Sequence, residues 1–283
     1  DDAIRGIVLC GRGRCFCGGA DIKELRQRPL PPSLPEVIIA IETSRKPFVA
    51  ALHGIAFGGG LELSLGCHYR IGAPSVQVGL PEVSLGLIPG AGGTQRLPRL
   101  IGAERGLNMI LNGKPVMAEE ALSLGILDAL VEEDSLLDHS ITFAIARAQE
   151  GEPYQSARNF RSTNPNTGAF MVMRNKIERR ARGLMAPWHC IESIENAFLI
   201  PFDEGLARER ELFLECRESE QSAGQQHVFF AEREARKITG VVRDASQRTI
   251  KSAAVIGCGT MGVGIAMCLA RVGIPVKILD KNA

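Results

Sequence analysis

Hydrophobic positions in the first 160 residues fall into short runs that are separated by glycine turns and by helix-period stretches. Runs with strand character cover residues 4–10, 47–53, 68–71, 77–80 and 126–131. Apolar spacings of three to four residues, typical of amphipathic helices, lie between them. Strands that alternate with helices indicate an α/β fold. We therefore expect residues 1–160 to form one α/β domain.

The pattern changes twice further along the chain. Residues 161–249 are long, charged, helix-period stretches, such as 191–197 and 204–217, without a convincing strand. An apolar strand at 252–256 follows, then a glycine turn, a helix through Arg271 and a second strand at 276–280. This order is typical of the first βαβ unit of a dinucleotide-binding domain. We therefore expect a helical connector at 161–249 and the start of a second domain at 250–283.

Composition limits the classes of partner. The 283 residues are 45% hydrophobic, enough for one full core and a second, smaller unit. The 33 Lys and Arg residues nearly balance 32 Asp and Glu residues, so the overall charge offers no general attraction for nucleic acid or for an anionic membrane. No apolar run reaches about 18 residues, the minimum for a membrane-spanning helix. An anionic ligand must therefore be held by local groups.

The eight cysteines are scattered without paired metal-ligand spacing. We interpret them as reduced thiols, most of them buried or half-buried, and we expect no metal site. The closest pair, Cys15 and Cys17, leaves a metal or redox site open as the alternative.

Two glycine-rich turns are candidates for binding a negatively charged oxygen. Gly58, Gly59 and Gly60 precede a stretch that we expect to be an amphipathic helix, and residues 18–19 precede Ala20 and another expected helix. Glycines let a ligand approach the backbone, and N–H groups at a helix start are free to donate. Two such donors aimed at one oxygen would stabilise the enolate of a thioester. The alternative is that the glycines only permit close helix packing.

Two glutamates stand close to these turns in the sequence. Glu62 follows the turn at Gly58, Gly59 and Gly60, and Glu82 follows a predicted strand in an apolar setting. Apolar surroundings raise the pKa of a carboxyl group toward neutrality, which suits it for proton transfer. The alternative for each residue alone is an ordinary surface or helix-capping glutamate.

Four strings together resemble the enoyl-CoA hydratase/isomerase, or crotonase, family. They are FCGGADI (16–22), GGGLE (58–62), LPE (80–82) and GLIPGAGGTQRL (86–97). The resemblance implies the crotonase ββα spiral fold. It also implies an oxyanion hole formed by the backbone N–H groups of Ala20 and Gly59, with Glu62 and Glu82 as the catalytic acid/base pair.

The resemblance implies a reaction as well. Glu62 would help to deprotonate a water molecule for attack on C3 of an enoyl-CoA, and Glu82 would supply a proton to C2. The substrate is a CoA thioester, and the hydratase needs no cofactor. Gly18 departs from the family, which usually has alanine there, and this departure concerns the rate more than the reaction.

The last part of the chain carries a dinucleotide-binding signature. Gly257, Gly259 and Gly262 satisfy G-x-G-x-x-G between a strand and a helix, with Met261 at the helix start and Asp280 ending the next strand. The glycines bring N–H groups to a pyrophosphate, and the acid accepts ribose hydroxyls, which favours NAD over NADP.

The string AVIGCGTMG (254–262) resembles the 3-hydroxyacyl-CoA dehydrogenase form of this turn, whose family places its catalytic residues beyond residue 283. A hydratase, a helical connector and this dehydrogenase follow one another in multifunctional enzymes of fatty-acid β-oxidation, both peroxisomal and bacterial. The resemblance continues through the connector in APWHC (186–190), PFDEG (201–205) and FFAER (229–233). We therefore expect a chain cut at both ends from such a protein.

The resemblance implies fatty-acid β-oxidation by a lyase, an isomerase and an oxidoreductase in one full-length protein. It would hydrate trans-2-enoyl-CoA to (S)-3-hydroxyacyl-CoA, shift Δ3 to Δ2 double bonds, and oxidise the product with NAD. We expect an acyl-CoA substrate, no nucleic acid and no membrane as partners. The full-length protein would be monomeric or paired with a thiolase. A bacterial cytoplasm is the expected location, with the peroxisome as the alternative.

Two alternative functions stay open at this point. One is a crotonase-family isomerase without hydratase activity, which would use chiefly Glu82. The other is a non-catalytic, RNA-binding hydratase-like protein in which Arg96, Arg99 and Arg105 form a basic face, although the balanced charge and the two glutamates argue against it.

Overall fold

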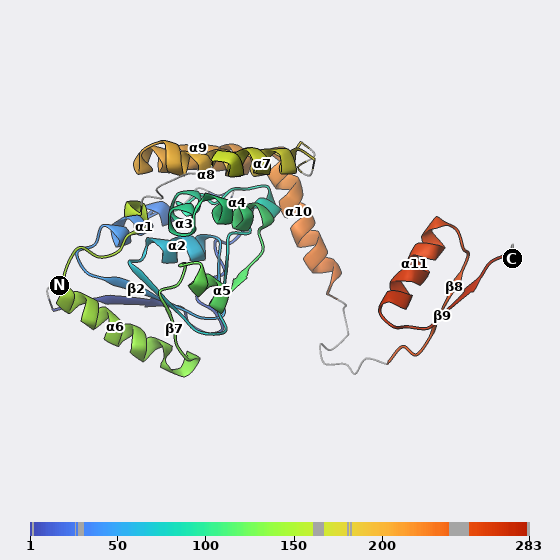
Figure 1. Cartoon of the computed structure of the whole chain (residues 1–283), viewed down its shortest axis with the longest axis horizontal. Helices are drawn as coiled ribbons and strands as arrows, with labels where there is room; N and C mark the ends of the chain where they lie inside the picture. The colour runs from blue at the N-terminus through green and yellow to red at the C-terminus, as the bar shows by residue number, and fades with distance from the viewer. Residues whose placement is uncertain are drawn as a thin grey trace. The chain divides into compact units, whose positions relative to one another are not determined.

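The structure of the chain is a computed structural model that describes residues 1, 3–25, 27, 31–160, 167–179, 181, 183–237 and 249–281. It divides into two compact units, Asp1–Glu234 and Ala235–Ala283 (Figure 1). No helix within the described residues is both long enough and apolar enough to cross a membrane.

Two small sheets form the centre of the first unit. The first is parallel and has the order β1-β2-β4-β7, and the second has the order β3-β5-β6, with β3 parallel and β6 antiparallel to β5. The strands are β1 (Ile7–Cys10), β2 (Phe48–Leu52), β3 (Ile55–Phe57), β4 (Tyr69–Gly72), β5 (Gln77–Gly79), β6 (Val116–Met117) and β7 (Ala129–Leu130).

Strand β2 shows why the sheet is covered on both faces. Its apolar run alternates between two cores: Val49 and Ala51 pack with residues of the long helix α6, whereas Ala50 and Leu52 join the larger core on the opposite face. Successive side chains of a strand point to opposite faces, so an uninterrupted apolar run requires a layer on each side. Figure 1 shows α6 on one side of the sheet and α2, α3 and α4 on the other.

Helices of different lengths follow the strands, and α6 is the longest of them. They are α1 (Leu34–Glu42), α2 (Gly59–Gly66), η1 (Glu82–Leu85), α3 (Gly93–Ile101), α4 (Ala103–Asn112), α5 (Ala118–Ser123), η2 (Glu133–Ser135), α6 (Leu136–Glu150) and η3 (Ala157–Asn159).

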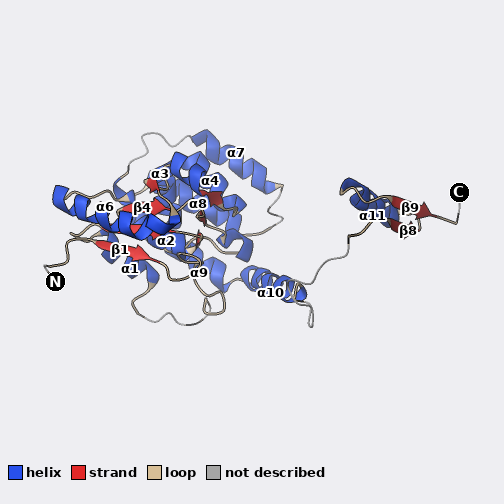
Figure 2. Ribbon diagram, turned by 90° about the horizontal axis from the view of Figure 1, so that it is seen from below, coloured by secondary structure: helices blue, strands red, loops and turns tan. Residues whose placement is uncertain are grey.

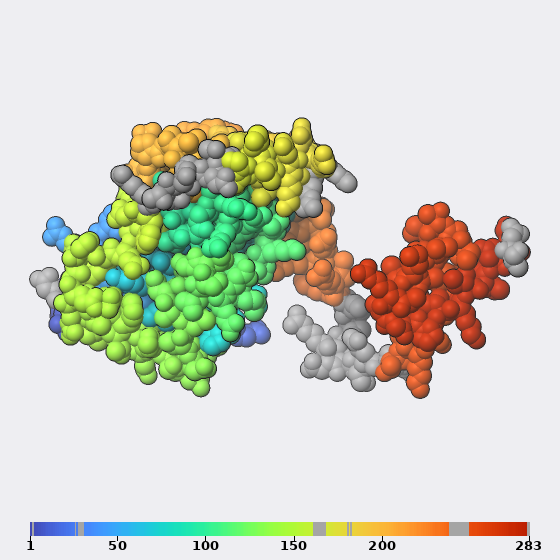
Figure 3. Space-filling view, viewed as in Figure 1, coloured from blue at the N-terminus to red at the C-terminus, as the bar shows by residue number. Residues whose placement is uncertain are grey.

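Every regular element within the described residues of the predicted connector is a helix. These helices are α7 (Thr167–Glu178), α8 (Ala186–Leu199), α9 (Phe202–Glu218) and α10 (Glu220–Ala235). Helix α8 packs on α3 and α4, α9 packs on α3, and α7 packs on α4. In the space-filling view, α7 and α9 form a layer over the green residues of α3 and α4 (Figure 3). These helices thus pack over α3 and α4 within the first unit, and they bring distant residues close to its glycine turns.

The second unit is one βαβ element. Strand β8 (Ala253–Ile256) leads into α11 (Thr260–Arg271), and β9 (Val276–Leu279) returns to pair with β8 in parallel register (Figure 2). The strand, turn, helix and strand order expected for residues 252–280 is therefore confirmed.

Three local expectations were wrong. Helix α2 is not amphipathic: Gly60, Leu61, Glu62, Ser64, Leu65 and Gly66 are all buried, because α1 and α3 pack against it from different sides. Residues 22–25 form turns instead of the helix expected after Ala20. Residues 55–57, for which no strand was predicted, form strand β3, whose partners β5 and Cys17 lie far away in the sequence.

Candidate active site

The two predicted oxyanion loops lie beside one another. Cys17 bridges to Ala56 in β3, with Cys17 N–H donating to the Ile55 carbonyl (3.1 Å) and Phe57 N–H donating to the Cys17 carbonyl (3.0 Å). An ideal Cβ on Gly19 would lie 3.5 Å from the backbone nitrogen of Gly59. The strand-like bridge therefore brings the loop that carries Ala20 next to the start of α2.

Glycine is required at Gly19 but not at Gly18. Gly19 has φ +95°, and a Cβ there would lie 2.9 Å from the Phe57 carbonyl oxygen. A Cβ on Gly18 would make an ordinary 3.7 Å contact with Ile55. A Cβ on Gly59 would lie 3.8 Å from the backbone nitrogen of Ala20. The N–H groups of Ala20 and Gly59 are thus neighbours, as an oxyanion hole requires.

Glu62 lies in the first turn of α2, only 3% exposed. Its Oε1 accepts hydrogen bonds from the backbone N–H groups of Ala91 (2.7 Å) and Gly93 (2.8 Å). Burial raises the pKa of Glu62, while these two N–H groups stabilise the charged form and oppose that rise. Gly93 permits the approach, since a Cβ there would lie 2.9 Å from Oε1.

Glu82 begins the short helix η1 after β5. Its Oε2 is buried and has no hydrogen-bond partner within the described residues. Burial raises the pKa of Glu82 well above its usual value, and the nearby charge of Glu62 raises it further. Gly58 lies against it, with an ideal Cβ 3.0 Å from Glu82 Oε1. Glu82 is therefore disposed to hold a proton at neutral pH.

The two glutamates have different environments, and this difference sets what they can do. Glu62 has two backbone donors on one oxygen, which stabilise its charged form against the effect of burial, so it is the better proton acceptor of the two. Glu82 has an unsatisfied buried oxygen next to a negative neighbour, so it can stay protonated and donate. Pairs of titratable groups whose surroundings separate their pKa values are typical of acid/base catalysis.

A third buried carboxylate, Glu209 of α9, was missed in the sequence. Its Oε1 accepts from the Gly92 N–H (2.6 Å) and its Oε2 from the Thr94 N–H (2.9 Å) and the Thr94 hydroxyl. A signal was present: Gly205, Glu209, Leu212 and Cys216 form the buried stripe of α9 at helical spacing. A glutamate within an otherwise apolar stripe indicates a paired, buried carboxylate.

The geometry of the dinucleotide turn in the second unit requires glycine at two of its positions. Gly257 has φ +101°, and a Cβ on Gly262 would collide with the Gly257 carbonyl oxygen at 1.8 Å. A Cβ on Gly259 would meet nothing within 4 Å, which leaves the backbone open to a ligand, and Met261 beside it is exposed. The Asp280 carboxylate at the end of β9 accepts a hydrogen bond from the Cys258 N–H. These residues fit an NAD pyrophosphate and ribose.

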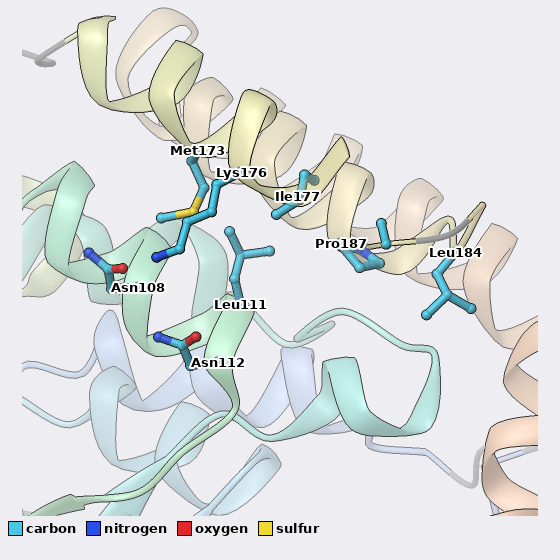
Figure 4. A pocket seen from close by; sticks show the side chains of 9 residues that line it. Asn108, Leu111, Asn112, Met173, Lys176, Ile177, Leu184 and Pro187 are labelled. Carbon is cyan, nitrogen blue, oxygen red and sulfur yellow. The ribbon is translucent and has the colours of Figure 1, made fainter. Parts of the chain in front are cut away.

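A cavity of about 190 Å³ lies elsewhere in the first unit, between α4 and the helices α7 and α8 (Figure 4). Its lining is mostly apolar, with three polar side chains. None of the predicted site residues lines it. The lining residues are Asn108, Leu111, Asn112, Met173, Lys176, Ile177, Ala181, Leu184 and Pro187.

The three arginines considered for an RNA-binding face do not share a surface. Arg96 is 1% exposed and donates to both carboxylate oxygens of buried Glu42, at 3.0 and 2.8 Å. Arg99 is half-buried over the Phe202 ring, and Arg105 is exposed. A basic face that includes Arg96 is therefore wrong, because its charge is neutralised inside the core.

Two regions of the chain match families of known proteins. Residues 1–163 match the family of enoyl-CoA hydratases/isomerases, and residues 252–283 match the NAD binding domain of 3-hydroxyacyl-CoA dehydrogenases. The chain belongs to the enoyl-CoA hydratase/isomerase family.

Relatives match it along its whole length. It is 44% identical over 290 residues to a peroxisomal bifunctional enzyme of Danio rerio, covering 100% of this chain and 40% of the relative. It is 39% identical over 293 residues to a peroxisomal fatty acid beta-oxidation multifunctional protein of Arabidopsis thaliana, covering 99% and 41%. The chain thus spans about two fifths of the length of these relatives.

Solved structures show the same fold. An enoyl-CoA hydratase/isomerase from Pseudoalteromonas atlantica is 25% identical, with a TM-score of 0.59 and coverage of 82% of this chain and 81% of that one. A carnitinyl-CoA dehydratase from Mycobacterium avium is 26% identical, with a TM-score of 0.59 and coverage of 81% and 80%. The predicted family, the α/β fold class and the NAD-binding unit are therefore confirmed.

Proposed function

We propose that the protein hydrates trans-2-enoyl-CoA thioesters to (S)-3-hydroxyacyl-CoA in fatty-acid β-oxidation, with Δ3,Δ2-enoyl-CoA isomerisation as a second activity. The observation that carries this proposal is the opposed pair of buried glutamates, Glu62 and Glu82, beside the neighbouring N–H groups of Ala20 and Gly59. An isomerase alone would need only one carboxylate, so the satisfied, chargeable Glu62 favours hydration.

Each residue has one role in the proposed reaction. The thioester oxygen accepts hydrogen bonds from Ala20 and Gly59, and these bonds stabilise the enolate that forms as water attacks. Glu62 takes a proton from the water whose oxygen bonds to C3. Glu82 gives its proton to C2. One proton enters and one leaves the protein, so a proton exchange between the glutamates restores the starting state.

Crotonyl-CoA hydration in the full-length protein tests this assignment. Glu62→Gln and Glu82→Gln should each lower kcat by about 10²–10⁴-fold, the usual contribution of general acid/base catalysis. Glu62→Gln should spare isomerisation more than Glu82→Gln does, because isomerisation needs no activated water. The exposed Glu104→Gln variant serves as the control. Hydration at the wild-type rate in both active-site variants would contradict the assignment.

We also propose NAD-dependent oxidation of the 3-hydroxyacyl-CoA product by the full-length protein. Bound NAD supplies the hydride acceptor for this step. Gly257, Gly259, Met261 and Gly262 would hold its pyrophosphate, and Asp280 its ribose. The relatives that match the whole chain are named bifunctional or multifunctional enzymes, which supports this combination.

The division into a hydratase domain (1–160), a connector (161–249) and the start of an NAD-binding domain (250–283) stays a prediction. So does the expectation of a full-length monomer or a complex with a thiolase. For the location, the names of the relatives favour the peroxisome, the alternative to a bacterial cytoplasm. Fluorescence microscopy of the tagged full-length protein in its own cells tests the location.

A further inference from the structure

The loop that holds Glu62 is bonded to two carboxylates in alternation. Along residues 91–94, the N–H groups of Ala91 and Gly93 donate to Glu62, whereas those of Gly92 and Thr94 donate to Glu209. Four successive backbone donors are thus divided between an active-site residue on α2 and a connector residue on α9. Nothing in the proposed reaction uses Glu209 directly.

The 91–94 segment, called the 91–94 loop below, is a glycine-rich turn that runs through the N-cap Gly92 into the first residues of α3. Gly90, Gly92 and Gly93 lie in or beside it, and Gly92 has φ +98°. Glycine carries the largest conformational freedom of any residue, so the exact course of this turn into α3 depends on the hydrogen bonds made to its N–H groups. Bonds from the opposite side fix the plane of the loop and, through it, the position of Glu62 Oε1.

Helix α9 is built to approach the loop closely. At Gly205, one turn before Glu209, a Cβ would lie 2.3 Å from the Gln95 side-chain oxygen of α3. At Gly90, the Phe213 ring occupies the space that a Cβ would take, at 2.4 Å. Both contacts require glycine, and together they place the Glu209 side chain, 1% exposed, against the backbone of the loop.

A buried network supports the Glu209 carboxylate. The Thr94 hydroxyl, which bonds to Glu209, is 2.6 Å from the Ser193 hydroxyl of α8, and the Gln95 amide donates to Thr94 Oγ1 (3.2 Å) and to the Ser193 carbonyl (2.7 Å). Thr94, Gln95 and Ser193 are all fully buried. Satisfied buried networks of this kind hold one geometry, because any displacement leaves donors without partners.

From this geometry we infer that Glu209 is a positioning residue of the hydratase site: it holds the 91–94 loop so that the loop holds Glu62. The inference rests on the proposed function. It assigns the connector a part in catalysis, since a helix more than a hundred residues from Glu62 completes the site. Glu209 touches neither substrate nor water in this assignment and acts only through the loop.

The charged and titratable groups that face Glu209 are Glu62 of α2, Glu82 of η1, Cys190 of α8 and its neighbour Arg210 of α9. A substitution at Glu209 therefore also alters the electrostatic surroundings of the two catalytic glutamates. The test must separate this loop-mediated effect from a general loss of stability.

Hydration of crotonyl-CoA by the full-length protein provides that test. Glu209→Gln places an amide NH2 against the N–H of Gly92 or Thr94, so kcat should fall about 10–100-fold while KM changes less than about threefold. Glu211→Gln, two residues along α9 with an exposed carboxylate that pairs with Arg208, is the matched control and should keep the wild-type kcat.

Double variants show whether Glu209→Gln lowers kcat through the 91–94 loop. In a Glu62→Asp background, the shorter side chain no longer reaches the N–H groups of Ala91 and Gly93. The decrease in kcat caused by Glu209→Gln should then be less than about threefold. In a Gly19→Ala background, which damages the oxyanion loop instead, the full factor should persist. Equal factors in both backgrounds, or a Glu209→Gln kcat within about twofold of the wild type, would overturn the inference.

A milder variant covers the case in which Glu209→Gln does not fold. Thr94→Val keeps the shape of the side chain and removes the hydroxyl that donates to Glu209, while the Gln95 amide loses its longer bond to Thr94 and keeps its bond to the Ser193 carbonyl. It should lower kcat about 3–10-fold with the same dependence on background. A rate unchanged by Thr94→Val would then count against the inference. If the wild type itself does not hydrate crotonyl-CoA, the proposed function fails and this inference with it, whereas an active wild type isolates the role of Glu209.

Discussion

The molecule carries two glycine turns that join a strand to a helix, and their surroundings differ. In the first unit, β3 runs into α2 through Gly58, where an ideal Cβ would lie 3.0 Å from Glu82, and a Cβ on Gly60 would lie 2.4 Å from the Cys17 carbonyl. In the second unit, β8 runs into α11 through Gly257 and Gly259, where a Cβ would meet nothing within 4 Å. One turn is enclosed and the other is open.

The difference shows how one local pattern serves two kinds of ligand. Both turns offer free N–H groups at a helix start. An enclosed turn presents single donors to one small oxygen among buried carboxylates, as a developing enolate requires. An open turn leaves a length of backbone accessible, which suits an extended pyrophosphate. The residues around a glycine turn, more than the glycines, therefore decide which anion it binds.

Among these changes, the largest effect should come from crowding the Gly19 loop, which lies beside the enclosed turn. Gly19→Ala combines an unfavourable φ of +95° with a Cβ 2.9 Å from the Phe57 carbonyl, so Ala20 must move away from Gly59. Loss of one oxyanion donor should lower the kcat for crotonyl-CoA hydration by about 10²–10³-fold. Gly18→Ala, which restores the residue usual in the family, is the matched control and should keep kcat within about twofold while raising stability by about 0.4–1 kcal/mol. Similar rates for both variants would show that Gly19 does not shape the hole.

The open turn should separate folding from binding. Gly262→Ala drives a Cβ into the Gly257 carbonyl and should lower the thermal midpoint, whereas Gly259→Ala has free space and should leave the fold intact. In the complete dehydrogenase domain, we expect Gly259→Ala to weaken NAD binding by about 10–100-fold, equal to about 1.4–2.8 kcal/mol of steric overlap. Isothermal titration with a parallel thermal melt measures both quantities. Unchanged NAD affinity in Gly259→Ala would contradict the assigned pyrophosphate site.

A smaller effect is expected at the acid beside the open turn. The Asp280 carboxylate would accept the ribose hydroxyls of NAD and would repel the 2′-phosphate of NADP in a partly desolvated site. Asp280→Ala should therefore narrow the preference for NAD over NADP by about tenfold or more, equal to about 1.4 kcal/mol. Titration of both cofactors against wild type and variant measures it, and equal affinities in the wild type would reject the claim.

The sequence predicted the parts of this comparison that depend on local pattern. The apolar runs at 47–53 and 77–80 predicted β2 and β5, and the glycine motif predicted the whole βαβ unit, because strand, turn and helix follow one another along the chain. Burial of α2 on all sides could not be read from eight residues, since it depends on α1 and α3. Glu209 was missed because its partners, Gly92 and Thr94, lie 117 and 115 residues away.

The smallest effect concerns how the enclosed site responds to pH. Burial, and next the charge of Glu62, raise the pKa of Glu209 to about 8, so the folded protein holds a proton there that the unfolded chain releases near its usual pKa of about 4.3. A group whose pKa is raised on folding stabilises the fold below its unfolded pKa. That contribution is lost as pH rises through about 8.

The unfolding free energy of the wild type should therefore fall from pH 5 to pH 8 by more than that of Glu209→Gln, with a difference in slope of at most about 1.4 kcal/mol per pH unit. Denaturant titrations at several pH values measure it, with Glu211→Gln expected to follow the wild type because its carboxylate is exposed. An equal fall in Glu209→Gln and in the wild type would mean that Glu209 is ionised in the fold throughout this range.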